Sequence, residues 1–247
     1  MKKTVLMMAA ALSLVMASCG NKPAEQTSEK SKTAKETVKP KKKKKAPKQE
    51  VQVESSAIHD IESVWISNDI DVDSGDITPD IETFACAFCD AYPDYEPNQA
   101  LYSYLVNPRG YDPEDNGFFI DNQRKYGYIS VRQETELDWL TTCCYWNRND
   151  GHKLFAVWMV EEHEDSSDEA RLLLFYDYDP YTDTMTPEPK LTRKVERAME
   201  DFDSYDVKLP AQGKDIELIG YVYDHDSSEN SYYMLHWNGY DFEMAAG

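Results

Sequence analysis

Four of the five cysteines lie in two close pairs, an arrangement found in redox and metal sites. Cys86 and Cys89 form a C-x-x-C motif, and Cys143 and Cys144 are adjacent. A redox-active C-x-x-C motif has its first cysteine at a helix N-terminus, where the helix dipole lowers the thiol pKa. Cys86 instead lies about two turns inside a predicted helix, which disfavours a redox site. Neighbouring cysteines on a strand, such as Cys143 and Cys144, point to opposite faces, which disfavours a four-cysteine zinc site. In an oxidising compartment we therefore expect one or two structural disulfides between these helix and strand cysteines.

Carboxylates recur along the chain at spacings that suit calcium ligands. The segment from Asp69 to Asp76 (DIDVDSGD) resembles the start of an EF-hand calcium loop, although Ser74 stands at the place of the loop glycine and Asp80 at that of the final glutamate. Residues 177–183 and 224–230 are looser oxygen-rich segments. Calcium takes about six to eight oxygen ligands, and turns use the same residue types. We therefore expect solvated turns here and assign no metal-binding residue.

The sequence lacks the common catalytic motifs. It contains no H-E-x-x-H metal motif, no G-x-S-x-G nucleophile turn and no glycine-rich phosphate loop. We accordingly assign no catalytic residue and no cofactor. One enzymatic alternative stays open, because glycosidases use two facing carboxylates and the acidic residues here allow many such pairs. The histidines are scattered along the chain: His59, His152, His163, His225 and His236.

Residues 1–18 have the build of a secretory signal peptide. Lys2 and Lys3 precede an apolar run over residues 4–16, which is shorter than the ~20 residues of a membrane-spanning helix. The end of this segment (VMASC), which finishes at Cys19, resembles the lipobox of bacterial lipoproteins, and its continuation (CGN) resembles lipoproteins of the Bacteroidetes group. The resemblance covers only about the first 21 residues. It implies cleavage before Cys19, a diacylglycerol on the Cys19 thiol and a further acyl chain, such as palmitate, on its amine.

The same resemblance implies a place in the cell. Several acyl chains on Cys19 make a stable membrane anchor, since each buried methylene contributes about 0.8 kcal/mol. No run of acidic residues follows Cys19, unlike in many surface-exported lipoproteins. We therefore expect the protein at the periplasmic face of the outer membrane.

Residues 19–52 are expected to form a disordered tether. Their Lys, Glu, Ser, Thr, Pro and Ala side chains cannot bury enough surface to offset the entropy lost on ordering. Residues 39–48 (KPKKKKKAPK) include seven lysines. This run suits anionic lipid headgroups, or it is a spacer that lies transiently on the chain's own acidic domain; the sequence leaves both open.

The net charge of −20 divides sharply along the chain. Residues 1–50 contain 13 of the 26 basic and 4 of the 46 acidic residues, for a net charge of +9. Residues 51–247 contain 13 basic and 42 acidic residues, for a net charge of −29. A domain with that charge repels phosphate, so we expect no nucleic-acid partner.

Residues 53–247 are expected to form one acidic domain of the α+β class. A helix is predicted to start at Thr78-Pro79-Asp80 and to end before Pro93, and further helices are predicted at residues 97–106 and 190–202. Consecutive hairpins, with turns at Asp150-Gly151 and Asn238-Gly239, favour an antiparallel meander with the N-terminal helices packed on one face. The first helix has the apolar stripe Ile81, Phe84, Ala85, Phe88 and Tyr92. The predicted strands span residues 126–132, 137–146, 152–161, 170–178, 216–223 and 232–237.

Together these features favour a non-catalytic binding module of the cell envelope over an enzyme. An acidic surface rich in Tyr and Trp suits basic proteins, basic peptides or glycans. The alternative is a glycosidase-like hydrolase that acts through paired carboxylates. The membrane is the other expected partner, through the lipid on Cys19, and the oligomeric state stays open.

Overall fold

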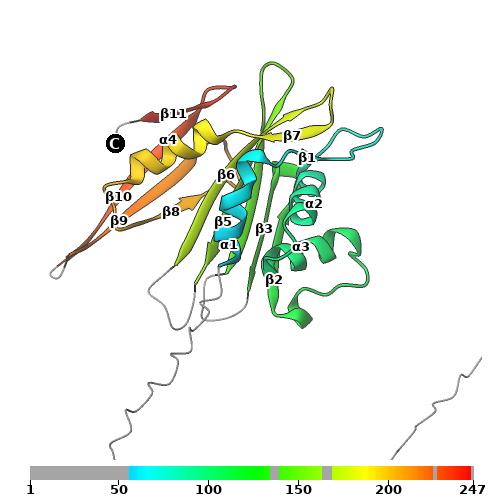
Figure 1. Ribbon diagram of the computed structural model, residues 1–247, viewed down its shortest axis with the longest axis horizontal. Helices are drawn as coiled ribbons and strands as arrows, with labels where there is room; N and C mark the ends of the chain where they lie inside the picture. Colours follow the sequence, from blue (N-terminus) through cyan, green and yellow to red (C-terminus); the bar gives the residue numbers. More distant parts are fainter. Residues whose placement is uncertain (1–55, 134–138, 163–168, 225–226, 246–247) are drawn as a thin grey trace, which may run out of the picture. The chain divides into compact units, whose positions relative to one another are not determined.

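The computed structural model describes residues 56–133, 139–162, 169–224 and 227–245, all within the compact unit Gln52–Gly247. The predicted signal peptide, Cys19 and the tether lie outside the described residues. The α+β class predicted from the sequence is confirmed, with α-helices and two antiparallel sheets (Figure 1). Within the described ranges, no helix has the length and apolar character needed to cross a membrane.

The larger sheet has seven strands in the order β1-β7-β6-β5-β4-β3-β2, and every neighbouring pair is antiparallel. Strands β2 to β7 follow one another as a meander, whereas β1 joins the far edge beside β7. The strands are β1 (Ile70–Asp71), β2 (Phe118–Gln123), β3 (Tyr128–Gln133), β4 (Leu140–Asn147), β5 (Lys153–Glu161), β6 (Ala170–Asp179) and β7 (Thr184–Pro187).

A second sheet of four strands has the order β11-β10-β9-β8 and is also antiparallel. Its predicted turn at Asn238-Gly239 is present, with Gly239 at φ +97°. This turn is bound to the β4–β5 turn, because the Asn149 N–H donates to the Gly239 carbonyl at 2.9 Å. The strands are β8 (Ser204–Lys208), β9 (Ile216–Asp224), β10 (Ser227–Trp237) and β11 (Phe242–Ala245).

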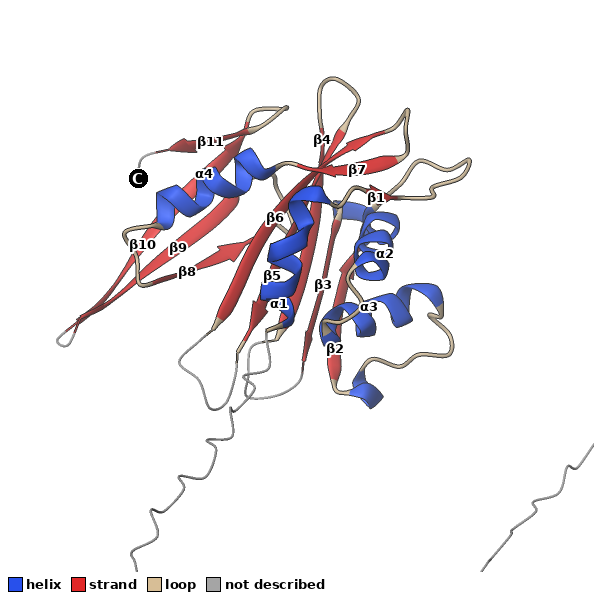
Figure 2. Cartoon of the chain, in the orientation of Figure 1, coloured by secondary structure: helices blue, strands red, loops and turns tan. Residues whose placement is uncertain are grey.

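Helices cover both faces of the seven-stranded sheet (Figure 2). Helices α1 to α3 share one core cluster with one face, and α4 shares the other cluster with the opposite face and the second sheet. The predicted helix layer on one face is therefore present, but the other face is covered too. The helices are α1 (Ala57–Val64), α2 (Ile81–Ala91), α3 (Glu96–Val106) and α4 (Pro189–Met199), with 3-10 turns η1 (Trp65–Ser67), η2 (Glu114–Asn116) and η3 (Arg124–Tyr126).

This double covering explains the composition of the central strands. All nine residues of β5 are buried, with Phe155 and Val157 in the cluster beside α1 to α3 and Leu154 and Trp158 in the other. A strand covered on both faces has no reason to alternate apolar with polar residues. The nearly continuous apolar run of β5 is the sequence signal of a three-layer fold.

Helix α2 starts later than the sequence pattern suggests. The predicted start at Thr78 is two residues too early, because Asp80 is the N-cap residue and the helix begins at Ile81. Its Oδ1 accepts hydrogen bonds from the backbone N–H groups of Glu82 at 3.0 Å and Thr83 at 3.3 Å, and its own N–H donates to Thr83 Oγ1 at 3.4 Å. A side-chain carboxylate at this place also interacts favourably with the helix dipole. The predicted apolar stripe of α2 is confirmed, since all five of its residues are buried.

Candidate functional site

A groove lies between the η1–β1 segment and α2, with a cavity volume of about 590 Å³. Four exposed carboxylates line it, those of Asp69, Asp71, Asp73 and Asp90. Among the described residues that line it there is no Lys, Arg or His. We call this cavity the acidic groove. Its other lining residues are Asn68, Ile70, Val72, Thr83, Cys86, Ala87, Ala91 and Tyr102.

One wall of the acidic groove is an extended segment whose side chains alternate. Ile70 and Val72 are 4% and 6% exposed and belong to the core, whereas Asp69, Asp71 and Asp73 are exposed. Alternate residues of an extended chain point to opposite sides, so Asp69 and Asp71 lie on the side opposite Ile70, and Asp73 follows where the chain turns, at φ +49°. No group of three or more His, Cys, Asp or Glu side chains within the described residues is arranged to hold a metal ion.

Strand β7 and the turn before it hold this segment in place. Ile70 lies opposite Met185 in the β1–β7 pair, and the Val72 N–H donates to the Asp183 carbonyl at 2.9 Å. The Asp183 carboxylate accepts from the Ser74 N–H at 2.8 Å and from the Tyr178 hydroxyl at 2.8 Å. Partial burial opposes ionisation of Asp183, but these hydrogen bonds outweigh it and hold its pKa below the usual value. Residues Tyr178 and Asp183 of the oxygen-rich segment 177–183 thus hold the segment from Asp69 to Asp76 in place.

Helices α2 and α3 supply the opposite wall. The negative charge of Asp90 on α2 raises the pKa of the Tyr102 hydroxyl on α3, which also donates a hydrogen bond to it. Partial burial, and then Asp90, raises the pKa of the Cys86 thiol. The wall therefore presents a carboxylate, a neutral thiol and a phenol, a set that attracts cations and has no thiolate nucleophile.

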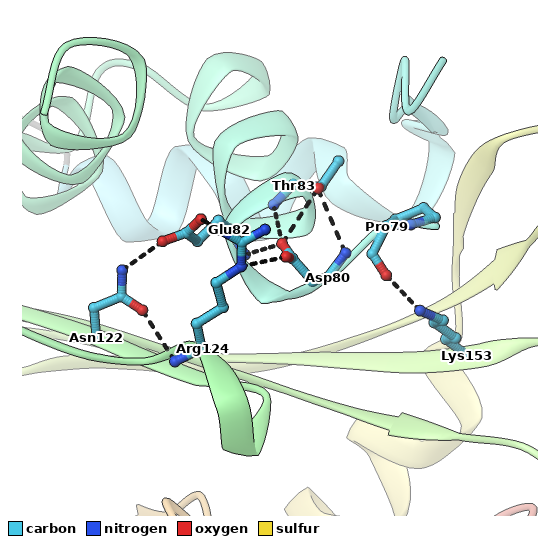
Figure 3. A network of polar contacts seen from close by, with 7 residues as sticks. All are labelled: Pro79, Asp80, Glu82, Thr83, Asn122, Arg124 and Lys153. Atoms are coloured by element: carbon cyan, nitrogen blue, oxygen red, sulfur yellow. Dashed lines mark hydrogen bonds and ion pairs between the residues drawn. The ribbon is translucent and has the colours of Figure 1, made fainter. Parts of the chain in front are cut away.

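A polar network fixes the start of α2 against the sheet (Figure 3). Arg124, in η3 between β2 and β3, binds Asp80 Oδ2 through Nε at 2.5 Å and Glu82 Oε2 through Nη1 at 2.8 Å. Asn122 of β2 donates from Nδ2 to Glu82 Oε1 at 2.7 Å. The carboxylate that caps the helix therefore also ties it to the β2–β3 turn.

Lys153, at the start of β5, also contacts the segment just before the N-terminal end of α2 (Figure 3). Its ammonium group donates to the Pro79 carbonyl and lies 5.5 Å from the centre of the Phe84 ring and 4.8 Å from that of Tyr145. Burial lowers the Lys153 pKa, while the two ring faces favour its charged form. Both contacts fix the position of the helix that forms one wall of the groove.

A second cavity, of about 410 Å³, adjoins the acidic groove and shares Asn68 and Ala91 with it. Asp60 of α1 and Asp94 contribute its carboxylates, and Ile61 and Val64 of α1 contribute apolar surface. The two cavities together extend from α2 to α1. The remaining residues around this second cavity are Ala57, Ser67, Tyr92 and Pro93.

The four cysteines of the domain are distributed over three environments. Cys89 and Cys143 lie in the core beside the N-terminal helices, Cys144 lies in the opposite cluster with its thiol 3.5 Å from the Pro210 carbonyl, and Cys86 is half-buried at the acidic groove. All four are free thiols. Burial raises the pKa of each, to about 12 for Cys144. A redox-catalytic motif needs the opposite shift, whereas the predicted structural disulfides are untested and stay a prediction.

The histidines do not gather at one place. His152 Nδ1 lies 2.8 Å from Asp177 Oδ2, and His236 Nδ1 lies 2.9 Å from Asp215 Oδ2. His59 is exposed on α1, and His163 and His225 lie outside the described residues. The side chains of residues 224–229, in the oxygen-rich segment 224–230, likewise lie outside the described residues.

Two glutamates at the ends of β5 and β6 form a carboxylate pair. Glu162 and Glu169 share a hydrogen bond, and Arg171 binds Glu169. Burial raises the pKa of Glu169, and the neighbouring Glu162 adds to the rise. The hydrogen bond from Arg171 opposes it. Glycosidase carboxyl groups are about 5–9.5 Å apart, so a pair in direct contact leaves no room for a sugar or water between them. Neither residue lines the acidic groove.

Of these features, the acidic groove combines a concave surface with several polar lining residues, and ligand sites are usually concave. The sequence pattern singled out Asp69, Asp71, Asp73 and Cys86 but did not bring them together. Tyr102 and Asp90 carried no sequence signal, because only the packing of α3 on α2 brings them to the groove. Comparisons of the chain with protein-family models, with curated proteins and with solved structures find no match.

Proposed function

We propose that this chain is a cell-envelope lipoprotein whose domain is a non-catalytic binding module for a basic peptide or a basic segment of a protein. One observation carries the proposal: four exposed carboxylates line a cavity of about 590 Å³, with no Lys, Arg or His among the described residues around it. Ligand sites have volumes of about 300–1,000 Å³, so the groove accommodates one or two side chains of a peptide.

Electrostatics and shape support a cationic ligand. A concave surface lined by charges of one sign focuses the potential and raises the local concentration of counter-ions. The net charge of −29 over residues 51–247 adds attraction at longer range. The apolar side chains of Ile61 and Val64 in the adjoining cavity suit the aliphatic stems of Lys and Arg, which pack on apolar surface while the charge stays solvated.

Removing groove carboxylates tests this function. We define the groove variant as Asp69→Asn/Asp71→Asn and the control variant as Glu114→Gln/Asp115→Asn, which neutralises two exposed acids of η2 away from the groove. A fluorescently labelled oligolysine peptide is titrated with the full chain at low ionic strength. Exposed ion pairs contribute about 0.2–1 kcal/mol each, so the groove variant should bind roughly fivefold more weakly.

The control variant should stay within about twofold of the wild type, because its carboxylates act only through the long-range field. Equal weakening of both variants would mean that the peptide responds to net charge and not to the groove. Equal affinity of the wild type and the groove variant would refute the proposed site.

The lipoprotein part of the proposal rests on the lipobox-like end of the signal peptide at Cys19. The lipid on Cys19 would hold the domain at the periplasmic face of the outer membrane. Metabolic labelling with radioactive palmitate should mark the wild type and leave Cys19→Ser unlabelled. Equal labelling of both proteins, or release of the wild type with an unmodified Cys19, would contradict the anchor.

A glycosidase-like hydrolase is the second candidate, and the raised pKa of Glu169 beside Glu162 favours it. The direct contact between the two carboxylates speaks against it. Incubation of the full chain with a glycan library discriminates the two functions. Turnover that Glu169→Gln abolishes would replace the binding function with the hydrolase, and we expect no turnover.

A further inference from the structure

The contacts between α2 and β4 bring Cys89 and Cys143 together in the core. The rings of Phe84 and Tyr145 pack edge to face with their centres 5.5 Å apart. Tyr145 and Cys143 are two residues apart on β4, so their side chains lie on the same face of the sheet. That face packs against the core cluster that contains α2, and Cys89 and Cys143 both belong to this cluster.

Burial and neighbouring contacts support the proximity of the two thiols. Cys89 and Cys143 are 1% and 0% exposed and belong to the same cluster. After burial itself, Cys143 is the next group that raises the pKa of Cys89. Two residues further along β4, Thr141 donates its hydroxyl to Asn98 Oδ1 of α3 at 2.8 Å, so the helices follow β4 past the cysteine pair.

The other two cysteines are placed differently. Cys144 follows Cys143 on a strand and lies in the cluster on the opposite face of the sheet, beside the Pro210 carbonyl. Cys86 lies one helical turn before Cys89 but lines the acidic groove and is only half-buried. Of the four thiols, Cys89 and Cys143 are the two that are fully buried in the cluster between the N-terminal helices and the sheet.

We propose that Cys89 and Cys143 form a disulfide bond that joins α2 to β4 when the chain folds in the presence of a disulfide oxidant. One S–S bond forms, and the two thiols together give up two protons and two electrons. The oxidant accepts them: its own S–S bond breaks through a mixed disulfide, and it leaves as two thiols. The exchange takes place during folding, because both thiols are closed to solvent once α2 packs on the sheet.

This bond fixes one wall of the acidic groove to the sheet, since α2 contributes Cys86 and Asp90 to that wall. Cys86 stays a thiol at the groove and Cys144 stays a thiol in the opposite core. The pairing is independent of the peptide-binding function, and either can fail without the other.

The test is refolding of the reduced full chain in a buffer of oxidised and reduced glutathione. Free thiols are then alkylated in denaturant and the protein is digested with chymotrypsin without reduction. Cleavage after Phe88 separates Cys86 from Cys89, and the variant Cys144→Ser removes the ambiguity at the adjacent pair. We expect a linked peptide pair that contains Cys89 and Cys143, two hydrogen masses lighter than the separate peptides, with Cys86 alkylated.

The double variant Cys86→Ser/Cys144→Ser should form the same link, and Cys89→Ser should lose it. Reductant should lower the thermal midpoint of the oxidised wild type by about 5 °C or more and leave that of Cys89→Ser unchanged. A link from Cys86 to Cys89 or to Cys143 would overturn the proposal. Complete alkylation of the double variant, with a native circular dichroism spectrum, would overturn it as well.

Discussion

Asp80 has two functions at the start of α2: its Oδ1 caps the helix and its Oδ2 binds Arg124. Loss of an N-cap carboxylate costs about 1 kcal/mol, and loss of an exposed ion pair costs about 0.5 kcal/mol. Asp80→Ala should therefore lower the free energy of unfolding by about 1.5 kcal/mol in urea denaturation. Asp80→Asn keeps a capping oxygen and should cost only about 0.5 kcal/mol. Equal losses in the two variants would contradict the capping role.

His152 makes the stability of the domain depend on pH. The hydrogen bond to Asp177 raises its pKa, with partial burial opposing and the charges of Asp177, Asp150 and Asp179 adding to the rise. Since the folded-state pKa is above that of the unfolded chain, about 6.5, its stabilisation is complete below about pH 6.5 and is lost as pH rises through the folded-state value. Urea denaturation of the wild type and His152→Gln between about pH 5.5 and 8.5 measures this, and the difference should shrink as pH rises. A difference that is constant over this range would contradict the assignment.

Residue types alone indicated which side chains are chemically reactive or able to bind ions, but not which of them lie close together in the fold. The chemistry of the cysteines pointed away from catalysis, and the raised thiol pKa values agree with that. The spacing of Asp69, Asp71 and Asp73 fits a calcium loop and an extended strand equally well. The pairing of Ile70 and Asp71 with β7 decides for a short strand, which the chain leaves before Asp73, at φ +49°.

Among the elements, those with strong local signals were predicted and those made by tertiary contacts were missed. The strands around Asp150-Gly151 and Asn238-Gly239 have clear turns and apolar runs. Helix α1 has no side-chain cap of its own. Instead, the buried Glu161 of β5 accepts from the Ser56 hydroxyl at 2.6 Å and the Ile58 N–H at 3.2 Å, a contact that no local pattern indicates. Strands β1, β2, β7 and β8 were likewise missed, and β1 exists only through its pairing with β7.

The turn between β10 and β11 joins the two sheets, and Gly239 is the residue on which this junction depends. At φ +97° an alanine is strained, and its Cβ would lie 2.5 Å from Asn149 Nδ2. Gly213 has nearly the same φ, +99°, but a Cβ added there would meet nothing within 4 Å. Gly239→Ala should therefore cost about 1 kcal/mol more than Gly213→Ala, whose cost of about 1–2 kcal/mol is backbone strain alone. Equal losses in thermal denaturation would show that the contact with Asn149 is unimportant.

On the scale of the whole molecule, the sequence predicts a sharp electrostatic contrast between residues 1–50 at +9 and residues 51–247 at −29. The predicted class and the strongly acidic domain follow from composition and pattern. The second sheet and the three-layer arrangement could not be predicted in this way, because they depend on which elements pack against each face of β5 and β6. The acidic groove also depends on tertiary packing, since the segment from Asn68 to Asp73 and the helices α2 and α3 form it only when they pack together.

The most direct test of the binding function is the ionic-strength dependence of the difference between the wild type and the groove variant Asp69→Asn/Asp71→Asn. Oligolysine affinity of both full chains is measured from about 0.02 M to about 1 M salt, over which the screening length falls to about 3 Å. The predicted ratio of affinities is roughly fivefold at the lowest salt and approaches one at the highest. A ratio of one at the lowest salt, or a ratio that salt leaves unchanged, would contradict an electrostatic peptide site in the acidic groove.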